Sequence, residues 1–349
     1  MKRKKAIDFL TAVLFFGILM SFLAYAGIGT LLRADGKNGN EKRFREVFYG
    51  DGLIQSVGRY CDYRIFRHTN AEHVLIGKEN FIFSTYDEKS GYDYLLDYVG
   101  GYAFTEAETD RIAYSLAEER QRYAELGTQY VVAVVPSSMT VCREYVPGFL
   151  GRQSENTRLS VLSTRLGSES AFLDLRAVMQ ENIREEMPYN NTEDSLNAYG
   201  AFSVYDAVMA HLDGSTQGEY SRISLEDIEF SVRMTEGREI AKKAGLQNVV
   251  QNRTVSLTDA MPRTYKTLRL RETSVGTSRL DGMLNPSSCL VVEVPSEWDR
   301  EQLMPFFSNS FDTVIYVPAG EKVEEVARAY HATAVVRILH EKDLGDLLT

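Results

Sequence analysis

The feature that most constrains the fold is a set of short apolar runs separated by helix-like segments. The clearest run, Q-Y-V-V-A-V-V-P, ends at Pro136 and follows a segment of helical periodicity that begins after Thr105 and stops at Gly127. Thr105 and Glu108 have the spacing of a capping box, and glycine commonly terminates helices. Continuous apolar runs are typical of strands covered on both faces, as in a parallel sheet.

The same alternation continues to the end of the chain. Further elements are predicted in the order strand 171–175, helix 198–212, strand 289–294, helix or turn 303–307, strand 312–317, helix 321–330, strand 334–339 and a short helical tail. Strands that alternate with helices predict a doubly wound, mostly parallel α/β sheet. The least regular region, about 214–288, is interpreted as an insertion that carries antiparallel pieces.

The N-terminus has the composition of a membrane anchor. Four basic residues among the first five precede residues 9–32, which contain no charge and are numerous enough to cross a hydrocarbon core. The positive charge places residues 1–8 in the cytoplasm and the rest outside. Ala24-Tyr25-Ala26 has the form of a signal-peptide cleavage site, but the apolar run continues past it. We therefore expect a transmembrane anchor at 9–32, a stalk at 33–69 and an extracytoplasmic domain at 70–349.

Charge and cysteine usage exclude several kinds of function. The net charge is −10 although four cations lie in the N-terminal tail, so the remainder is strongly acidic and nucleic acid is not an expected partner. Cys61, Cys142 and Cys289 cannot form a disulfide framework and match no metal spacing; we expect small buried hydrophobic residues. The sequence contains no Gly-rich phosphate loop, and we expect neither a cofactor nor a metal.

Several segments, in order, resemble one protein family. V-L-I-G-K-E-N-F-I-F (74–83), V-V-P-S-S-M-T-V-C-R-E-Y-V-P (134–147) and F-L-D-L-R (172–176) are similar to its opening segment, its proline-ended strand and its short Asp-Leu strand. T-E-D-S-L-N-A-Y-G-A-F (192–202) falls where the family has Thr-Asp-x-His-Trp followed by Gly-Ala. The strand that ends in V-P-S-E-W (294–298) falls where the family has Asp-Ser-Phe.

This family is the SGNH-hydrolase-like group that contains the AlgX/AlgJ polysaccharide O-acetyltransferases and the DHHW proteins. The resemblance implies an SGNH-hydrolase-like fold. It also implies that Ser296 stands at the family's nucleophile position, Glu193 at its carboxylate position and Ser195 at its histidine position. A serine nucleophile needs a base, and a second serine cannot take its proton near neutral pH. The resemblance thus implies a degenerate, non-catalytic member that acts in cell-envelope glycan modification by binding a polysaccharide or a membrane-bound acyltransferase.

Two alternatives remain open at this stage. An active O-acetyltransferase or esterase would use Ser296 with an unrecognised base. Of the five histidines, His211 lies near a helix end and His331 and His340 flank the last predicted strand, which leaves His68 or His73 to supply it. The other alternative is a structural scaffold for an acyl-transporting membrane protein.

Two further segments have competing interpretations. Glu193 and Asp194 could bind a cation through their oxygens, but adjacent acids at a helix start are more often favoured by the helix dipole. The tyrosine-rich tract 86–98 could line a carbohydrate groove, because aromatic rings stack on sugar faces. It could equally be an irregular loop packed by its own rings.

Overall fold

A computed structural model describes residues 17, 62–63, 69–167, 171–183, 186–216, 220–258, 276–279, 285–320 and 322–348. The chain divides into two compact units, residues 1–66 and 67–349, and the fold below is that of the second. None of the helices in the described part combines the length and the hydropathy of a membrane span. The predicted anchor, apart from Gly17, and nearly all of the predicted stalk lie outside the described residues.

The centre of the domain is a six-stranded sheet with the strand order β6-β5-β12-β10-β11-β9. Its strands are β5 (Gln129–Val135), β6 (Phe172–Asp174), β9 (Gly276–Arg279), β10 (Asn285–Val294), β11 (Phe311–Pro318) and β12 (Ala334–His340). The pairs among β6, β5, β12, β10 and β11 are all parallel, and β9 adds an antiparallel edge to β11. The predicted mixed α/β fold with a central parallel sheet is confirmed.

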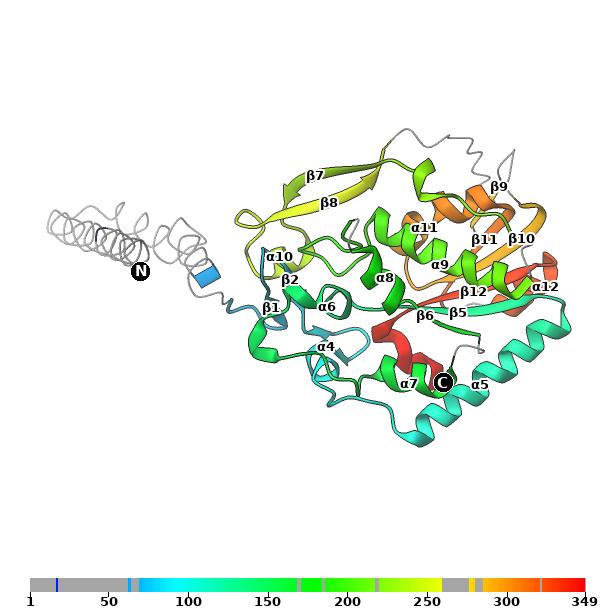
Figure 1. The fold of residues 1–349 in the computed structure, drawn as a ribbon, viewed down its shortest axis with the longest axis horizontal. Coiled ribbons are helices and arrows are strands. Elements are labelled where there is room, and N and C mark those ends of the chain that lie inside the picture. Colours follow the sequence, from blue (N-terminus) through cyan, green and yellow to red (C-terminus); the bar gives the residue numbers. More distant parts are fainter. Residues whose placement is uncertain are drawn as a thin grey trace, which may run out of the picture. The chain divides into compact units, whose positions relative to one another are not determined.

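Helices cover both faces of this sheet (Figure 1). Side chains alternate along each strand: in β10, Leu290 and Val292 join one core cluster, while Val291 joins the other. The first cluster packs against α8 (Arg176–Asn182), α9 (Ala198–Thr216) and α11 (Glu297–Ser310). The second packs against α5 (Glu106–Glu125), α7 (Arg158–Leu166), α12 (Val323–Ala329) and the 3₁₀ helix η5 (Glu341–Leu348).

Local sequence signals account for several helix boundaries. The predicted capping box begins α5: Thr105 Oγ1 accepts a hydrogen bond from Glu108 N, and the Glu108 carboxylate accepts one from Thr105 N. The helix or turn expected at 303–307 is part of a longer helix, α11, which begins directly after Ser296. The C-terminal tail is helical as expected, but in the 3₁₀ form.

The irregular region after α9 contains an antiparallel hairpin. Strands β7 (Phe230–Glu236) and β8 (Gln251–Leu257) pair along their whole length, with α10 (Glu239–Lys243) in the connection between them. The ring of Phe230 contacts Tyr199 and Phe202, which holds this hairpin against α9.

The start of the domain consists of two small antiparallel ribbons. The first pairs β1 (Val74–Ile76) with β2 (Ile82–Ser84). The second pairs β3 (Tyr86–Asp87) with β4 (Tyr92–Asp93), and the short helix α4 (Tyr94–Tyr98) follows. The tyrosine-rich tract 86–98 consists of β3, β4 and α4 with the turn between the two strands.

Gly200 in the first turn of α9 permits a close backbone approach. A Cβ atom at this position would lie 2.2 Å from the carbonyl oxygen of Pro188. Asn197 begins the same helix, since its Oδ1 accepts a hydrogen bond from Gly200 N while its Nδ2 donates to Met187 O. The opening of α9 is therefore fixed tightly against residues 187–188, and this positions the loop that leads into it.

The cysteines that the structure describes behave as small hydrophobic residues. Cys142 and Cys289 are buried and are not disulfide-bonded. Burial raises the pKa of the Cys142 thiol to about 12, so this thiol stays protonated. Cys61 lies outside the described residues.

Candidate functional site

A cavity of about 870 Å³ opens where the central parallel strands end. Its walls include Ser137 just after β5, Ser296 just after β10 and His340 at the end of β12. Because β5, β12 and β10 are neighbours and parallel, their carboxyl ends meet at one edge. Open α/β sheets bind ligands at this edge. The cavity is therefore the candidate site.

The three residues predicted from the family resemblance all line this cavity. Glu193 and Ser195 come from the loop before α9, and Ser296 comes from the end of β10. An isolated β-bridge between Tyr189 and Leu196 closes that loop. Residues far apart in sequence are thus brought to one site, while their assignment as catalytic positions remains a prediction.

Ser296 is the N-cap of α11. Its Oγ accepts a hydrogen bond from Asp299 N at 3.1 Å and donates one to Asp299 Oδ2 at 2.5 Å. Serine is a preferred N-cap because its oxygen satisfies a free N–H in the first turn. Among the described residues, no imidazole forms a hydrogen bond with Ser296, and the hydroxyl proton is directed at a carboxylate.

An ion pair lies directly behind Ser296. His340 Nε2 is 3.1 Å from both carboxylate oxygens of Asp299, which is only 4% exposed. Burial raises the pKa of Asp299, but the charge and hydrogen bond of His340 outweigh it and the net pKa is lowered. Burial lowers the pKa of His340, but the charge and hydrogen bond of Asp299 raise it by more, so the net pKa of His340 is raised.

The order of these groups differs from that of a serine-hydrolase triad. In a triad the imidazole stands between the serine and the carboxylate and takes the serine proton. Here Asp299 stands between Ser296 and His340. A carboxylate whose pKa is lowered is a weak base, and in this arrangement it takes the place beside the serine that the imidazole has in a triad.

His340, which was not among the histidines expected near the site, lines the cavity. The residue is the last of β12 and forms part of the cavity wall, next to the strand that ends before Ser296. Exposed His73 packs against Tyr86 with the two rings tilted by 34° and 4.8 Å between ring centres, but it does not line the cavity, and neither do His211 and His331. His68 lies outside the described residues.

Glu193 is held by donors on the hairpin side of the cavity. Its Oε1 accepts hydrogen bonds from Asn190 Nδ2 at 2.5 Å and Asn252 Nδ2 at 3.4 Å, and lies 3.7 Å from Arg238 Nε. Ser195 is half-buried and forms no hydrogen bond with another described residue. The carboxylate that would orient an imidazole at position 195 is therefore bound to protein donors instead.

Asp194 and Glu193 do not point at a common ligand position. Asp194 Oδ1 accepts a hydrogen bond from Ser138 Oγ at 2.6 Å, and burial raises the pKa of Asp194. Within the described part of the chain, no group of three His, Cys, Asp or Glu side chains has a geometry that could hold a metal ion. The structure thus gives the cation interpretation of these two acids no supporting geometry.

Sequence reasoning missed a buried acid at the base of the cavity. Glu341, 1% exposed, accepts hydrogen bonds from Ser137 N at 2.7 Å and Thr140 Oγ1 at 3.0 Å. Burial, reinforced by the nearby charge of Asp97, raises the pKa of Glu341 to about 7. The only sequence signal was its place directly after His340, at the end of a central strand.

Aromatic rings form part of the cavity wall. Trp298, the only tryptophan in the chain, is 37% exposed and donates a hydrogen bond from Nε1 to Leu196 O. Tyr86 also lines the cavity. Tyr94 borders it but is only 6% exposed and, like Tyr92, belongs to the core. Rings of the tyrosine-rich tract therefore lie both at the cavity and in the core, and its role in binding carbohydrate stays a prediction.

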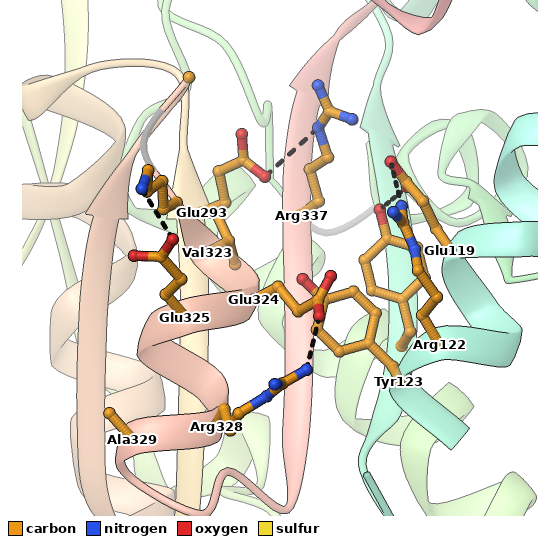
Figure 2. Close-up of a pocket in the computed structure, with 13 residues that line it drawn as sticks. Glu119, Arg122, Tyr123, Glu293, Val323, Glu324, Glu325, Arg328, Ala329 and Arg337 are labelled. Atoms are coloured by element: carbon orange, nitrogen blue, oxygen red, sulfur yellow. Dashed lines mark hydrogen bonds and ion pairs between the residues drawn. The ribbon is translucent and has the colours of Figure 1, made fainter. Parts of the chain in front are cut away.

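A second cavity, of about 770 Å³, lies between α5, α12 and the sheet (Figure 2). Its charged side chains neutralise one another in pairs. The pairs are Glu324 with Arg328, Glu325 with Lys322, Glu293 with Arg337, and Glu119 with Arg122. This cavity contains none of the predicted site residues, so the cavity at the strand ends is the better candidate.

The parallel sheet, its two helical layers and the site at the strand ends define a mixed, doubly wound α/β protein. Among solved structures the chain is similar to Bacillus cereus PatB1 with a sulfonyl adduct, at 12% identity and a TM-score of 0.55 over 79% of this chain and 97% of that one. It is also similar to a DHHW family protein from Eubacterium siraeum, at 10% identity and a TM-score of 0.50 over 77% and 94% of the two chains. The fold implied by the sequence resemblance is confirmed. No protein-family model matches the sequence, and no curated protein matches it significantly.

Proposed function

We propose that this chain is a membrane-tethered, extracytoplasmic glycan-binding protein of cell-envelope polysaccharide acetylation that does not itself catalyse acyl transfer. The order of family motifs along the sequence supports the link to polysaccharide acetylation, and the apolar run at 9–32 supports the tether. A membrane-bound acyltransferase is the partner that such a protein would serve.

One observation carries the non-catalytic part of the proposal. The Ser296 hydroxyl caps α11 and donates its proton to Asp299, a carboxylate whose pKa is lowered. The position that carries the family imidazole is Ser195. General-base assistance contributes on the order of 10²–10⁴-fold to such reactions, and none of the described residues brings an imidazole or amine into a hydrogen bond with the Ser296 hydroxyl.

The composition of the cavity wall supports glycan binding. Sugars present hydroxyl groups that bind carboxylates and flat faces that stack on aromatic rings. The cavity offers both, with Trp298 and Tyr86 beside Asp and Glu side chains at the ligand-binding edge of the sheet.

The contact between His340 and Asp299 favours a second candidate function, an active esterase or O-acetyltransferase. If Ser296 turned away from Asp299 towards the imidazole, His340 would become its base. This candidate requires the cap of α11 to open, because the same hydroxyl serves both purposes.

Labelling with a sulfonyl fluoride separates the two candidates. PatB1, whose structure carries a sulfonyl adduct, is the positive control. We expect the purified full-length chain to remain unlabelled under conditions that modify PatB1, and to show no acetyl-ester turnover above background. Labelling that disappears in both Ser296→Ala and His340→Gln would instead establish the second candidate.

A further inference from the structure

The candidate cavity has a large excess of acidic side chains. Nine Asp and Glu residues line it, against three lysines and His340. Two of the three lysines form ion pairs with acids of the cavity. Lys342 Nζ is 2.9 Å from Asp87 Oδ2, and Lys243 Nζ is 3.3 Å from Glu88 Oε1. With His340 paired to Asp299, the cavity keeps a net negative charge after its internal pairs are formed.

Two of these acids are available to a ligand. Glu239 is exposed in the first turn of α10, and Asp343 is half-buried in η5. Neither side chain forms a hydrogen bond or an ion pair with another described residue, and both line the cavity. They belong to different elements, so two separate parts of the cavity wall each offer a carboxylate.

We propose that the ligand of this cavity is a glycan with free amino groups, such as a partly de-N-acetylated amino sugar. The inference rests on the proposed glycan-binding function and specifies its ligand class. Ammonium groups on the sugar would pair with Glu239 and Asp343, while a sugar ring stacks on the exposed indole of Trp298. A uronic-acid or phosphate-bearing glycan would be repelled by the same walls.

Tryptophan fluorescence provides a readout confined to this site, because Trp298 is the only tryptophan of the chain. The full-length chain is titrated with three oligosaccharides of equal length: a glucosamine oligomer, the N-acetylated oligomer and a galacturonate oligomer. At about pH 6 the sugar amines are charged, as are α-amino groups, whose pKa is near 8. We expect the glucosamine oligomer to bind about tenfold more tightly than the acetylated one, and the galacturonate oligomer to bind weakest.

Two variants test whether the preference depends on the named acids. Glu239→Gln and Asp343→Asn should each reduce affinity for the glucosamine oligomer by about two- to fivefold, as for partly exposed ion pairs. Affinity for the acetylated oligomer should stay unchanged. Glu226→Gln, which neutralises an exposed acid outside the cavity, is the matched control and should change neither affinity.

The outcomes separate this inference from the proposed function. Equal binding of the acetylated and glucosamine oligomers, or a preference for the galacturonate oligomer, overturns the amino-sugar inference and leaves glycan binding intact. If none of the three oligomers changes Trp298 fluorescence or produces heat in calorimetry, glycan binding itself is contradicted. A preference that is unaltered in both acid variants would also overturn the inference.

Discussion

Glu341 should make the stability of the domain depend on pH near neutrality. Its carboxyl group is 1% exposed, and burial raises its pKa to about 7 in the folded chain. The ordinary value for glutamate, which applies in the unfolded chain, is about 4.3. An acid whose pKa is raised by folding holds its proton more tightly in the native state, so stability falls as pH rises from about 4 through 7.

The size of this effect follows from the two pKa values. A difference of nearly three pH units corresponds to about 4 kcal/mol, which is an upper value for the loss between about pH 4 and pH 8. Glu341→Gln cannot ionise, so this part of the pH dependence should disappear. The variant should therefore gain stability relative to the wild-type chain as pH rises.

Urea denaturation of both proteins at several pH values measures the difference directly. The free energy of unfolding of Glu341→Gln minus that of the wild type should become more positive by up to about 4 kcal/mol between about pH 4 and pH 8. Glu226→Gln, at an exposed position, should give a difference that does not change with pH. A pH-independent difference for Glu341→Gln would refute the reasoning, since it would mean that Glu341 titrates normally.

Three further predictions concern the cap, the helix start and the missing base. Ser296→Ala should lower the free energy of unfolding by about 1 kcal/mol through loss of the α11 N-cap, with Ser296→Thr retaining most of it in the same denaturation assay. Gly200→Ala should lower the free energy of unfolding by about 1–3 kcal/mol or more, because the new Cβ would lie 2.2 Å from Pro188 O. Gly214→Ala in the same helix is the control: its Cβ would meet nothing within 4 Å, so the stability should stay the same or rise. Ser195→His should add no sulfonyl-fluoride labelling, because the Ser296 hydroxyl remains bound to Asp299; labelling at the rate of PatB1 would show that only the imidazole was missing.

Much of the fold could be predicted from the sequence because its signals are local. The run that ends at Pro136 became β5, the box at Thr105 and Glu108 became the N-terminus of α5, and the hydrophobic alternation located the later strands. Element ends were less exact. α9 runs to Thr216 rather than 212, since its last turn lacks a strong stop signal apart from Gly214.

The site was harder to predict because it depends on which strands become neighbours. Ser296 and His340 are adjacent only because β12 inserts between β5 and β10, and nothing in the sequence near either residue specifies that order. The sequence S-E-W-D does contain the spacing of an N-cap and its N3 partner, Ser296 and Asp299. The same serine matches the nucleophile of the resembled family, so the local sequence is compatible with either role. Glu341 has no local signature at all, since its raised pKa is a product of burial.

The measurement that tests the account most directly is a pair of assays on one preparation of the full-length chain. Fluorescence of Trp298 is followed during oligosaccharide titration, and the same protein is then exposed to a sulfonyl fluoride beside PatB1. We expect saturable binding reported by Trp298 together with no covalent labelling of Ser296. Rapid labelling of Ser296, or the absence of any glycan-dependent change at Trp298, would contradict it.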